Sequence, residues 1–203
     1  MRWCCPGGAR PVCVLTGTDA AVYGVTLLDD ELFVVRWKQA DRVEVYDAVD
    51  DFRHLRHMSI IHLQPAAVPD GGRLRSLLSY LRVTTARETD TGPLPARLTD
   101  VASCHITSTL YVSDLSNCRI LRLRPQDAAV MAQWPVDGGA YGLSVTAAGE
   151  LVVCCTGALE LRRYRADGHL LGRVRLPSDC LQPWHAVQLP LSDCLAVCHG
   201  GRS

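Results

Sequence analysis

The chain has 203 residues, of which 48% are apolar, and this is enough to bury the core of about one domain. The 21 basic and 21 acidic residues give a formal net charge of +0, so no overall field attracts DNA or an anionic membrane. No apolar run is long enough for a transmembrane helix, and the N-terminal segment lacks the apolar core of a signal peptide, so we expect a cytoplasmic protein.

A short apolar motif, Leu-x-Val, recurs along the chain in the setting of a predicted strand. Its four copies begin at Leu32, Leu110, Leu151 and Leu195. A second short strand precedes each copy, and two more follow each of the first three copies after turn residues. The last three copies are separated by about 40 residues, the length of one four-stranded propeller blade. The sequence therefore predicts an all-β fold, a partial β-propeller of four-stranded antiparallel blades.

The repeat divides the chain into three complete units and an incomplete fourth. The expected segments are an N-terminal segment with a closing strand (1–20), blade 1 (21–60), an insertion (61–97), blade 2 (98–136), blade 3 (140–177) and an incomplete blade 4 (182–203). Three blades and part of a fourth do not close a ring, since propellers have roughly four to eight blades. The chain is then a fragment of a longer propeller or part of an assembly, and its incomplete blades could support self-association.

The segment 61–97 lacks the Leu-x-Val pattern, which favours an insertion over a decayed blade. Within it, leucines at Leu74, Leu77, Leu78 and Leu81 share one face of a short amphipathic helix. Such a helix could dock on a partner or a membrane. It could equally lie on the flank of the propeller or be marginal within a loop, because two turns are unstable without something to pack on.

One repeat resembles a known family. The stretch LYVSDLSNCRILRL, Leu110–Leu123, is similar to the NHL repeat, whose pattern runs Tyr-Val-Ala-Asp, a small turn and then Asn-x-Arg-Ile. The matching positions are Tyr111, Val112, Asp114, Asn117, Arg119 and Ile120. The other units share mainly the apolar skeleton of six-bladed, TolB-like propellers, because unit one has Arg36 in place of the Asp and unit three has Cys155.

The resemblance implies a structural role for Asp114 and Arg119. In NHL repeats the Asp accepts backbone N–H groups of the tight turn, and the Arg that opens the next strand pairs with it. We therefore expect Asp114 and Arg119 to form a structural turn pair and not a catalytic one.

Enzymes of the propeller superfamily place polar residues at the axis, often around a metal. The candidates here are His105, His185, His199, Asp114 and Glu150, and no pair among them has a diagnostic metal-ligand spacing. We predict no catalytic residue, no metal and no cofactor. The ten cysteines lie partly inside apolar runs, which favours free thiols over disulfides.

Aromatic and basic residues suggest a contact surface. Trp37, at a strand end between Arg36 and Lys38, is the predicted binding patch. Tyr141 and Trp184 occupy the same position of the repeat, and we expect them to pack between blades.

Two functions from different classes follow from these patterns. The first is a non-catalytic interaction module of the NHL/TolB-like type, which binds a protein through loops at one end of the propeller and could alternatively bind RNA. The second is a propeller-type hydrolase or lyase with an axial metal site. Carboxylates and imidazoles lining the axis would favour the enzyme, whereas small apolar residues there would favour the binding module.

Overall fold

The computed structural model describes residues 21–36, 42–49, 52–60, 95–190 and 192–200. Within these ranges the chain forms strands and no helix. The strands assemble into three four-stranded sheets and one two-stranded sheet, each antiparallel and each in sequence order. The predicted all-β fold of a partial propeller, with three full units and an incomplete fourth, is confirmed.

Each sheet comes from one repeat unit. Sheet 1 contains β1 (Val22–Leu28), β2 (Glu31–Arg36), β3 (Arg42–Asp47) and β4 (His54–Ser59). Sheet 2 contains β5 (Leu98–Cys104), β6 (Thr109–Asp114), β7 (Arg119–Leu123) and β8 (Val130–Pro135). Sheet 3 contains β9 (Ala140–Val145), β10 (Leu151–Cys155), β11 (Glu160–Tyr164) and β12 (Leu170–Arg175). Sheet 4 contains β13 (Gln182–Gln188) and β14 (Leu195–Gly200).

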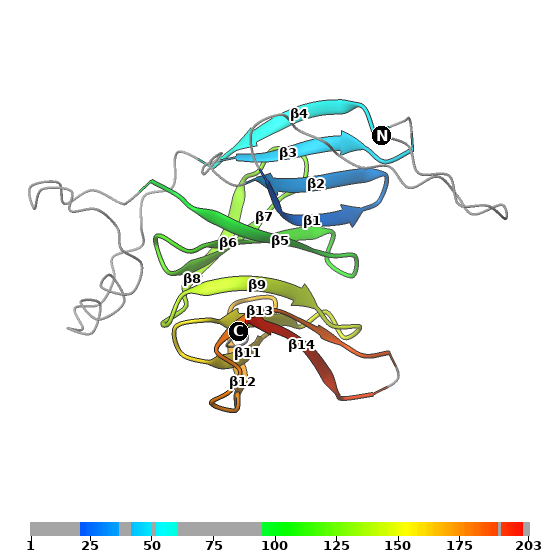
Figure 1. Cartoon of the computed structure of the whole chain (residues 1–203). Coiled ribbons are helices and arrows are strands. Elements are labelled where there is room, and N and C mark those ends of the chain that lie inside the picture. Colours follow the sequence, from blue (N-terminus) through cyan, green and yellow to red (C-terminus); the bar gives the residue numbers. More distant parts are fainter. Residues whose placement is uncertain (1–20, 37–41, 50–51, 61–94, 191, 201–203) are drawn as a thin grey trace, which may run out of the picture.

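The four sheets follow one another in an open arc (Figure 1). Their first strands, β1, β5, β9 and β13, lie side by side and form the inner rim of the arc, whereas the later strands of each sheet lie farther out. This order follows from short hairpins, since each strand pairs with the next one in the chain.

Buried side chains between neighbouring sheets hold the arc together. Val45 of sheet 1 packs with Val101 and Val112 of sheet 2 in one hydrophobic cluster. A second cluster joins sheets 2 and 3, and a third joins sheet 3 to Ala186 of sheet 4. Sheets 2 and 3 are therefore covered on both faces, which fits the near-continuous burial of β6 and β10.

Several expectations concern residues outside the described ranges. They are the closing strand in 1–20, the insertion apart from its last residues and the helix around 73–81. No helix long and apolar enough to cross a membrane occurs among the described residues. The seven cysteines in the described ranges are all free.

Candidate functional site

The inner strands share an irregularity at the same position of the repeat. In each, one extra residue interrupts the pairing with the second strand of its sheet, between Val22 and Gly24 in β1, between Leu98 and Asp100 in β5 and between Pro183 and His185 in β13. The pairing of β9 with β10 shifts at the equivalent place. A β-bulge bends the strand and redirects side chains, so these four bulges change the direction of the rim residues together.

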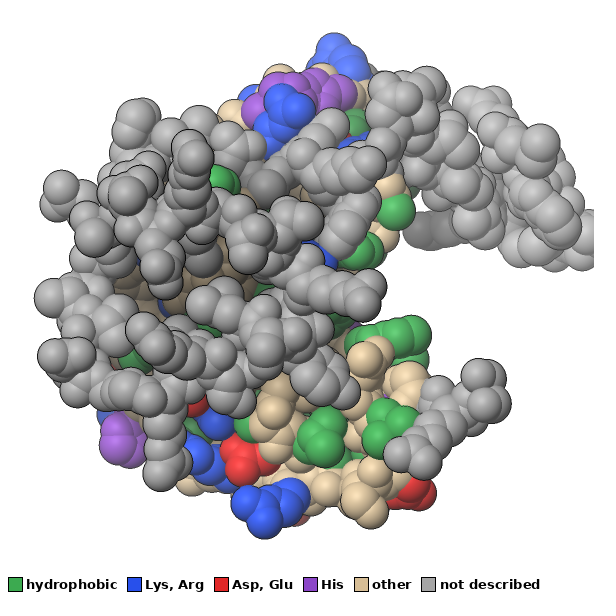
Figure 2. Space-filling model, turned by 60° about the vertical axis from the view of Figure 1, so that its left-hand side comes forward, with side chains coloured by type: hydrophobic (Ala, Val, Ile, Leu, Met, Phe, Trp, Pro, Cys, Tyr) green, Lys and Arg blue, Asp and Glu red, His purple; other side chains and the backbone are tan. Residues whose placement is uncertain are grey.

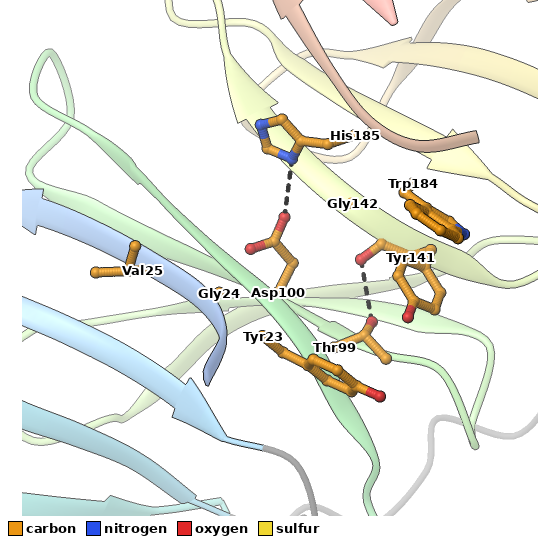
Figure 3. Close-up of a pocket in the computed structure, with 9 residues that line it drawn as sticks. All are labelled: Tyr23, Gly24, Val25, Thr99, Asp100, Tyr141, Gly142, Trp184 and His185. Carbon is orange, nitrogen blue, oxygen red and sulfur yellow. Dashed lines mark hydrogen bonds and ion pairs between the residues drawn. The ribbon is translucent and has the colours of Figure 1, made fainter. Parts of the chain in front are cut away.

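The bulges surround an open pocket of about 540 Å³ on the inner rim. Its lining residues come from all four sheets and are Tyr23, Gly24, Val25, Thr99, Asp100, Tyr141, Gly142, Trp184 and His185. Figure 3 shows this pocket with the inner strands crossing it. We call it the axial pocket, because it lies where the first strands of the sheets converge.

Aromatic side chains gather in one part of the axial pocket. The rings of Tyr23 and Tyr141 are 6.5 Å apart between centroids, and Trp184 lines the same pocket (Figure 3). The side chain of Trp184 is 46% exposed, so the expectation that it packs between blades is wrong. Trp184 is the extra residue of the β13 bulge, and its side chain lines the axial pocket. Three large rings thus offer apolar faces to a ligand.

A carboxylate and an imidazole meet in the other part of the pocket. Asp100 Oδ2 lies 3.2 Å from Nδ1 of His185, although the two residues belong to sheets 2 and 4. The same oxygen accepts a hydrogen bond from the backbone N–H of Leu143, at 2.8 Å. Asp100 Oδ1 accepts one from the N–H of Val101. One carboxylate therefore links the rims of three successive sheets.

The ion pair affects the protonation of His185. Its hydrogen bond to Asp100 raises the pKa of His185 above the ordinary 6.5, against the opposing effect of partial burial. Burial also raises the pKa of Tyr141, with a further contribution from the neighbouring Tyr23. The pocket therefore favours protonated forms of both His185 and Tyr141.

Small residues make the convergence of the rims possible. Around the arc, the position after the bulge alternates between glycine and a larger residue: Gly24, Asp100, Gly142 and His185. A Cβ on Gly24 would overlap the Asp100 carboxylate, and a Cβ on Gly142 would overlap the backbone carbonyl of Trp184. Each glycine thus lets the next sheet approach closely.

Buried hydroxyl groups fasten sheets 2 and 3 behind the pocket. The hydroxyl oxygens of Thr99 and Ser113 are 2.8 Å apart, and each hydroxyl donates to the backbone oxygen of Tyr141 at 3.0 Å. Both side chains are buried. Because these bonds hold the backbone of Tyr141, they also hold the position of its ring.

The pocket does not resemble a metal centre. No group of three or more His, Cys, Asp or Glu side chains in the described part of the chain could hold a metal ion. Of the residues considered as axial ligands, His185 alone lines the pocket. His105 and His199 are exposed elsewhere, and Glu150 forms an ion pair with Arg163.

The predicted turn pair lies away from the axial pocket, at the hairpin between β6 and β7. Arg119 Nε donates to Asp114 Oδ2 at 2.9 Å, and the Asn117 side chain donates to the same oxygen at 2.8 Å. The backbone N–H groups of Arg97 and Asn117 donate to Oδ1. Asp114 is completely buried, so its charge is balanced by these donors.

Of the predicted binding patch, only Arg36 lies among the described residues. Trp37 and Lys38 lie outside the described residues. Arg36 is buried, and its Nε donates to Glu44 Oε2 at 2.6 Å while Tyr46 donates to the same oxygen. Arg36 therefore does not present its charge on an exposed surface, because it neutralises Glu44.

Tyr23 and Asp100 line the pocket, but the sequence predicted a functional role for neither of them. Asp100 provides the contact with His185. Its position was visible in the repeat, where Asp100 and His185 fall in the same column as two glycines. The pairing of the two could not be inferred, because they are far apart in the chain and meet only when sheets 2, 3 and 4 form an arc.

Comparisons with known proteins bear on the fold. No family model matches the sequence. No curated protein is significantly similar to it in sequence. The described arrangement, by contrast, is similar to that of many solved structures.

Three of these similar structures belong to different proteins. Virginiamycin B lyase from Staphylococcus aureus is 12% identical, with a TM-score of 0.55 over 87% of this chain and 48% of the lyase chain. The WD40 β-propeller domain of Doa1 is 12% identical, with a TM-score of 0.58 over 90% of this chain and 49% of its own. Hydrazine synthase from Kuenenia stuttgartiensis is 13% identical, with a TM-score of 0.61 over 91% of this chain and 44% of its own.

At these identities the similarity shows the fold and nothing finer. The chain is a β-propeller module, and it spans about half the length of the structures that it resembles.

Proposed function

We propose that this chain is a non-catalytic protein-interaction module of the NHL/TolB-like propeller type, and that it binds a partner segment at the aromatic part of the axial pocket. The observation that carries the proposal is the cluster of Tyr23, Tyr141 and Trp184 around one opening. Tyr and Trp are the residues that most often dominate the energy of protein interfaces, and here they are held by a rigid rim.

The charge of the pocket favours a protein partner over RNA. Among the residues that the structure describes, its lining contains Asp100 and His185 but no lysine or arginine. Single-stranded RNA needs a positively charged groove along its backbone in addition to rings on which bases stack. A peptide needs only apolar surface and a few polar contacts, and the axial pocket has both.

The Asp100–His185 pair gives a second candidate function, a propeller-type hydrolase or lyase. A carboxylate that orients an imidazole is a frequent arrangement for a general base. Both oxygens of Asp100, however, also accept backbone N–H groups, and the one from Leu143 joins sheet 2 to sheet 3, which supports a structural role. The interaction module is therefore the better supported function.

The experiment that tests the proposal is selection of random linear peptides displayed on phage against the purified chain. Selected peptides are then measured by fluorescence polarisation against the wild type, Tyr141→Ala and Trp184→Ala. We expect each substitution to weaken binding by at least about 10-fold, since aromatic anchors commonly contribute about 2 kcal/mol or more. The matched control is Ile106→Ala, which removes an exposed apolar side chain outside the pocket.

Three outcomes would overturn the proposal. The first is that no peptide is selected. The second is that selected peptides bind Tyr141→Ala and Trp184→Ala as tightly as they bind the wild type. The third is that labelled oligouridine binds more tightly than any peptide and loses affinity with Trp184→Ala, which would assign the pocket to RNA.

A further inference from the structure

The two ends of the arc expose residues that are buried everywhere else in the repeat. The pairing registers identify equivalent positions, because Val25, Val101, Leu143 and Ala186 each pair with the valine of the Leu-x-Val strand in their own sheet. Val101, Leu143 and Ala186 are each 2% exposed, whereas Val25 is 54% exposed. The preceding sheet covers the first three, and no described sheet covers Val25.

The other end of the arc is exposed in the same way. Ala196 of β14 is exposed, although its equivalents Phe33, Tyr111 and Val152 are completely or almost completely buried. Val187 of β13 is 42% exposed on the face of sheet 4 that points away from sheet 3. Figure 2 shows a notch in one side of the molecule with hydrophobic side chains on either side of it. Sheet 1 thus lacks a neighbour before it, and sheet 4 lacks one after it, among the sheets that the structure describes.

We propose that two copies of this chain associate head to tail, with the exposed face of sheet 1 in each copy packed against the exposed face of sheet 4 in the other. The contact repeats the one between successive sheets within the chain. It does not depend on the function proposed for the axial pocket.

The rim residues show that these two faces match. Thr26 of sheet 1 meets Ser103 of sheet 2, and their hydroxyl oxygens are 2.8 Å apart. These two residues define a pair of repeat positions that meet between one sheet and the next. The same two positions are Ala102 and Val145 between sheets 2 and 3, and both belong to one hydrophobic cluster. The positions therefore agree in polarity at both of these contacts.

The two outer sheets of the arc, sheet 1 and sheet 4, show the same agreement in polarity. The position of Thr26 is Val187 in sheet 4, and the position of Ser103 is Leu27 in sheet 1. Both are apolar, and Leu27 is 47% exposed. Val187 of one copy would meet Leu27 of the other, so a head-to-tail contact pairs apolar with apolar.

The alternation after the bulges also continues across such a contact. Gly24, Asp100, Gly142 and His185 alternate small with large, and each glycine is needed because the next sheet approaches closely. In a head-to-tail pair, His185 of one copy is followed by Gly24 of the other. The pattern of close approach then runs through the whole assembly.

The number of sheets supports a pair of copies. The chain spans 44% to 49% of two of the propeller-like structures that it resembles, so two copies have about the length of one whole structure. Four sheets in each copy make eight in the pair, and rings of roughly four to eight blades are typical. Two such contacts related by a two-fold axis close the ring.

The experiment is sedimentation velocity of the purified full chain over a range of concentrations. We expect a species of twice the 22.2 kDa of one chain. Leu27→Arg and Val187→Glu each bury an unpaired charge in both contacts, and each should weaken association by at least about 100-fold. The control Val49→Arg places the same charge on a side chain that is 74% exposed outside both faces, and it should associate like the wild type.

A mixture of the two variants tests the direction of the contact. In a mixed pair, one contact is native and the other joins the introduced arginine of one copy to the introduced glutamate of the other. An equimolar mixture should therefore regain the dimer. Circular dichroism melts of each variant establish that it is folded.

Several results would overturn the proposal. A wild-type chain that is monomeric at all concentrations would assign both faces to other partners, such as further sheets of a longer chain. Disruption by Leu27→Arg alone would indicate a contact between two copies of sheet 1, and a mixture that stays monomeric would exclude head-to-tail packing.

Discussion

Sheets 1 and 2 share an apolar skeleton but stabilise their second hairpin with different polar groups. In sheet 2, Asp114 at the end of β6 pairs with Arg119, which opens β7. In sheet 1 the position of Asp114 is Arg36, and its partner is Glu44, in the middle of β3. The comparison teaches that a buried charge at this hairpin can be neutralised by more than one pair of residues, because either arrangement satisfies a buried ion.

The largest expected effect tests whether the pair in sheet 2 is needed. Asp114→Ala removes the acceptor of two backbone N–H groups and leaves the nearly buried Arg119 without its carboxylate. We expect a loss of about 3–5 kcal/mol in the free energy of unfolding, measured by urea denaturation. Asp167→Ala, which removes an exposed partner of Arg165, is the control and should change the midpoint little. Similar losses in both variants would contradict the assignment.

The next effect tests the contact between the rims of the two sheets. Gly24→Ala places a methyl group 2.7 Å from the backbone nitrogen of Val101 and against the Asp100 carboxylate. Overpacking of this kind costs about 1–3 kcal/mol. Gly172→Ala adds the same methyl group in β12 with nothing within 4 Å, so its unfolding midpoint should not fall by a comparable amount. Equal destabilisation by both substitutions would show that the rims do not meet at Gly24.

A pH titration of stability examines the pair in sheet 1. Burial tends to raise the pKa of Glu44, but hydrogen bonds from Arg36 and Tyr46 outweigh it, and the pKa lies below the ordinary 4.5. Because the folded pKa is lower than the unfolded one, the stabilisation is present above pH 4.5 and is lost as pH falls through the folded pKa.

The measurement is urea denaturation of the wild type and Glu44→Gln between about pH 7 and pH 3. The variant should be less stable at the upper end, and the difference should shrink as the pH falls. A difference that stays constant over the range would mean that the charge of Glu44 does not contribute.

The smallest expected effect is on the pKa of His185. It tests Asp100 of sheet 2, which occupies the repeat position that Gly24 occupies in sheet 1. The pKa of His185 should lie above 6.5 in the wild type and fall in Asp100→Asn, as measured by NMR titration of the ring protons. The folded pKa is raised, so the pair stabilises the fold below pH 6.5 and the stabilisation is lost as pH rises through the folded pKa. The gain is at most about 1 kcal/mol because His185 is half exposed. An unchanged pKa in Asp100→Asn would exclude the pair.

Much of this fold could be predicted because its strands are local. The Leu-x-Val copies at Leu32, Leu110 and Leu151 begin or lie within the second strand of their sheets, and the last copy forms β14 of a two-stranded sheet. Among the described strands, each of these pairs only with its neighbours in the sequence, so periodicity and turn residues were sufficient to define it.

The surroundings of individual side chains could not be predicted in the same way. Arg36 follows an apolar strand and precedes Trp37 and Lys38, which indicated an exposed basic patch. Its burial depends on Glu44 and Tyr46, which reach it from the neighbouring strand. Trp184 differs from its prediction in the opposite direction. The repeat pattern predicted that its ring packs between blades, but the ring lies at the β13 bulge and is exposed.

The amino-acid sequence by itself determined the repeat and the short antiparallel strands within each unit. These properties depend on hydrophobic periodicity and turn chemistry over a few residues. Only the tertiary structure decided that the rims converge, that Asp100 reaches His185 and that Val25 stays exposed where Val101 is buried. Those outcomes depend on which sheet covers which face, and this is set by packing between residues far apart in the chain.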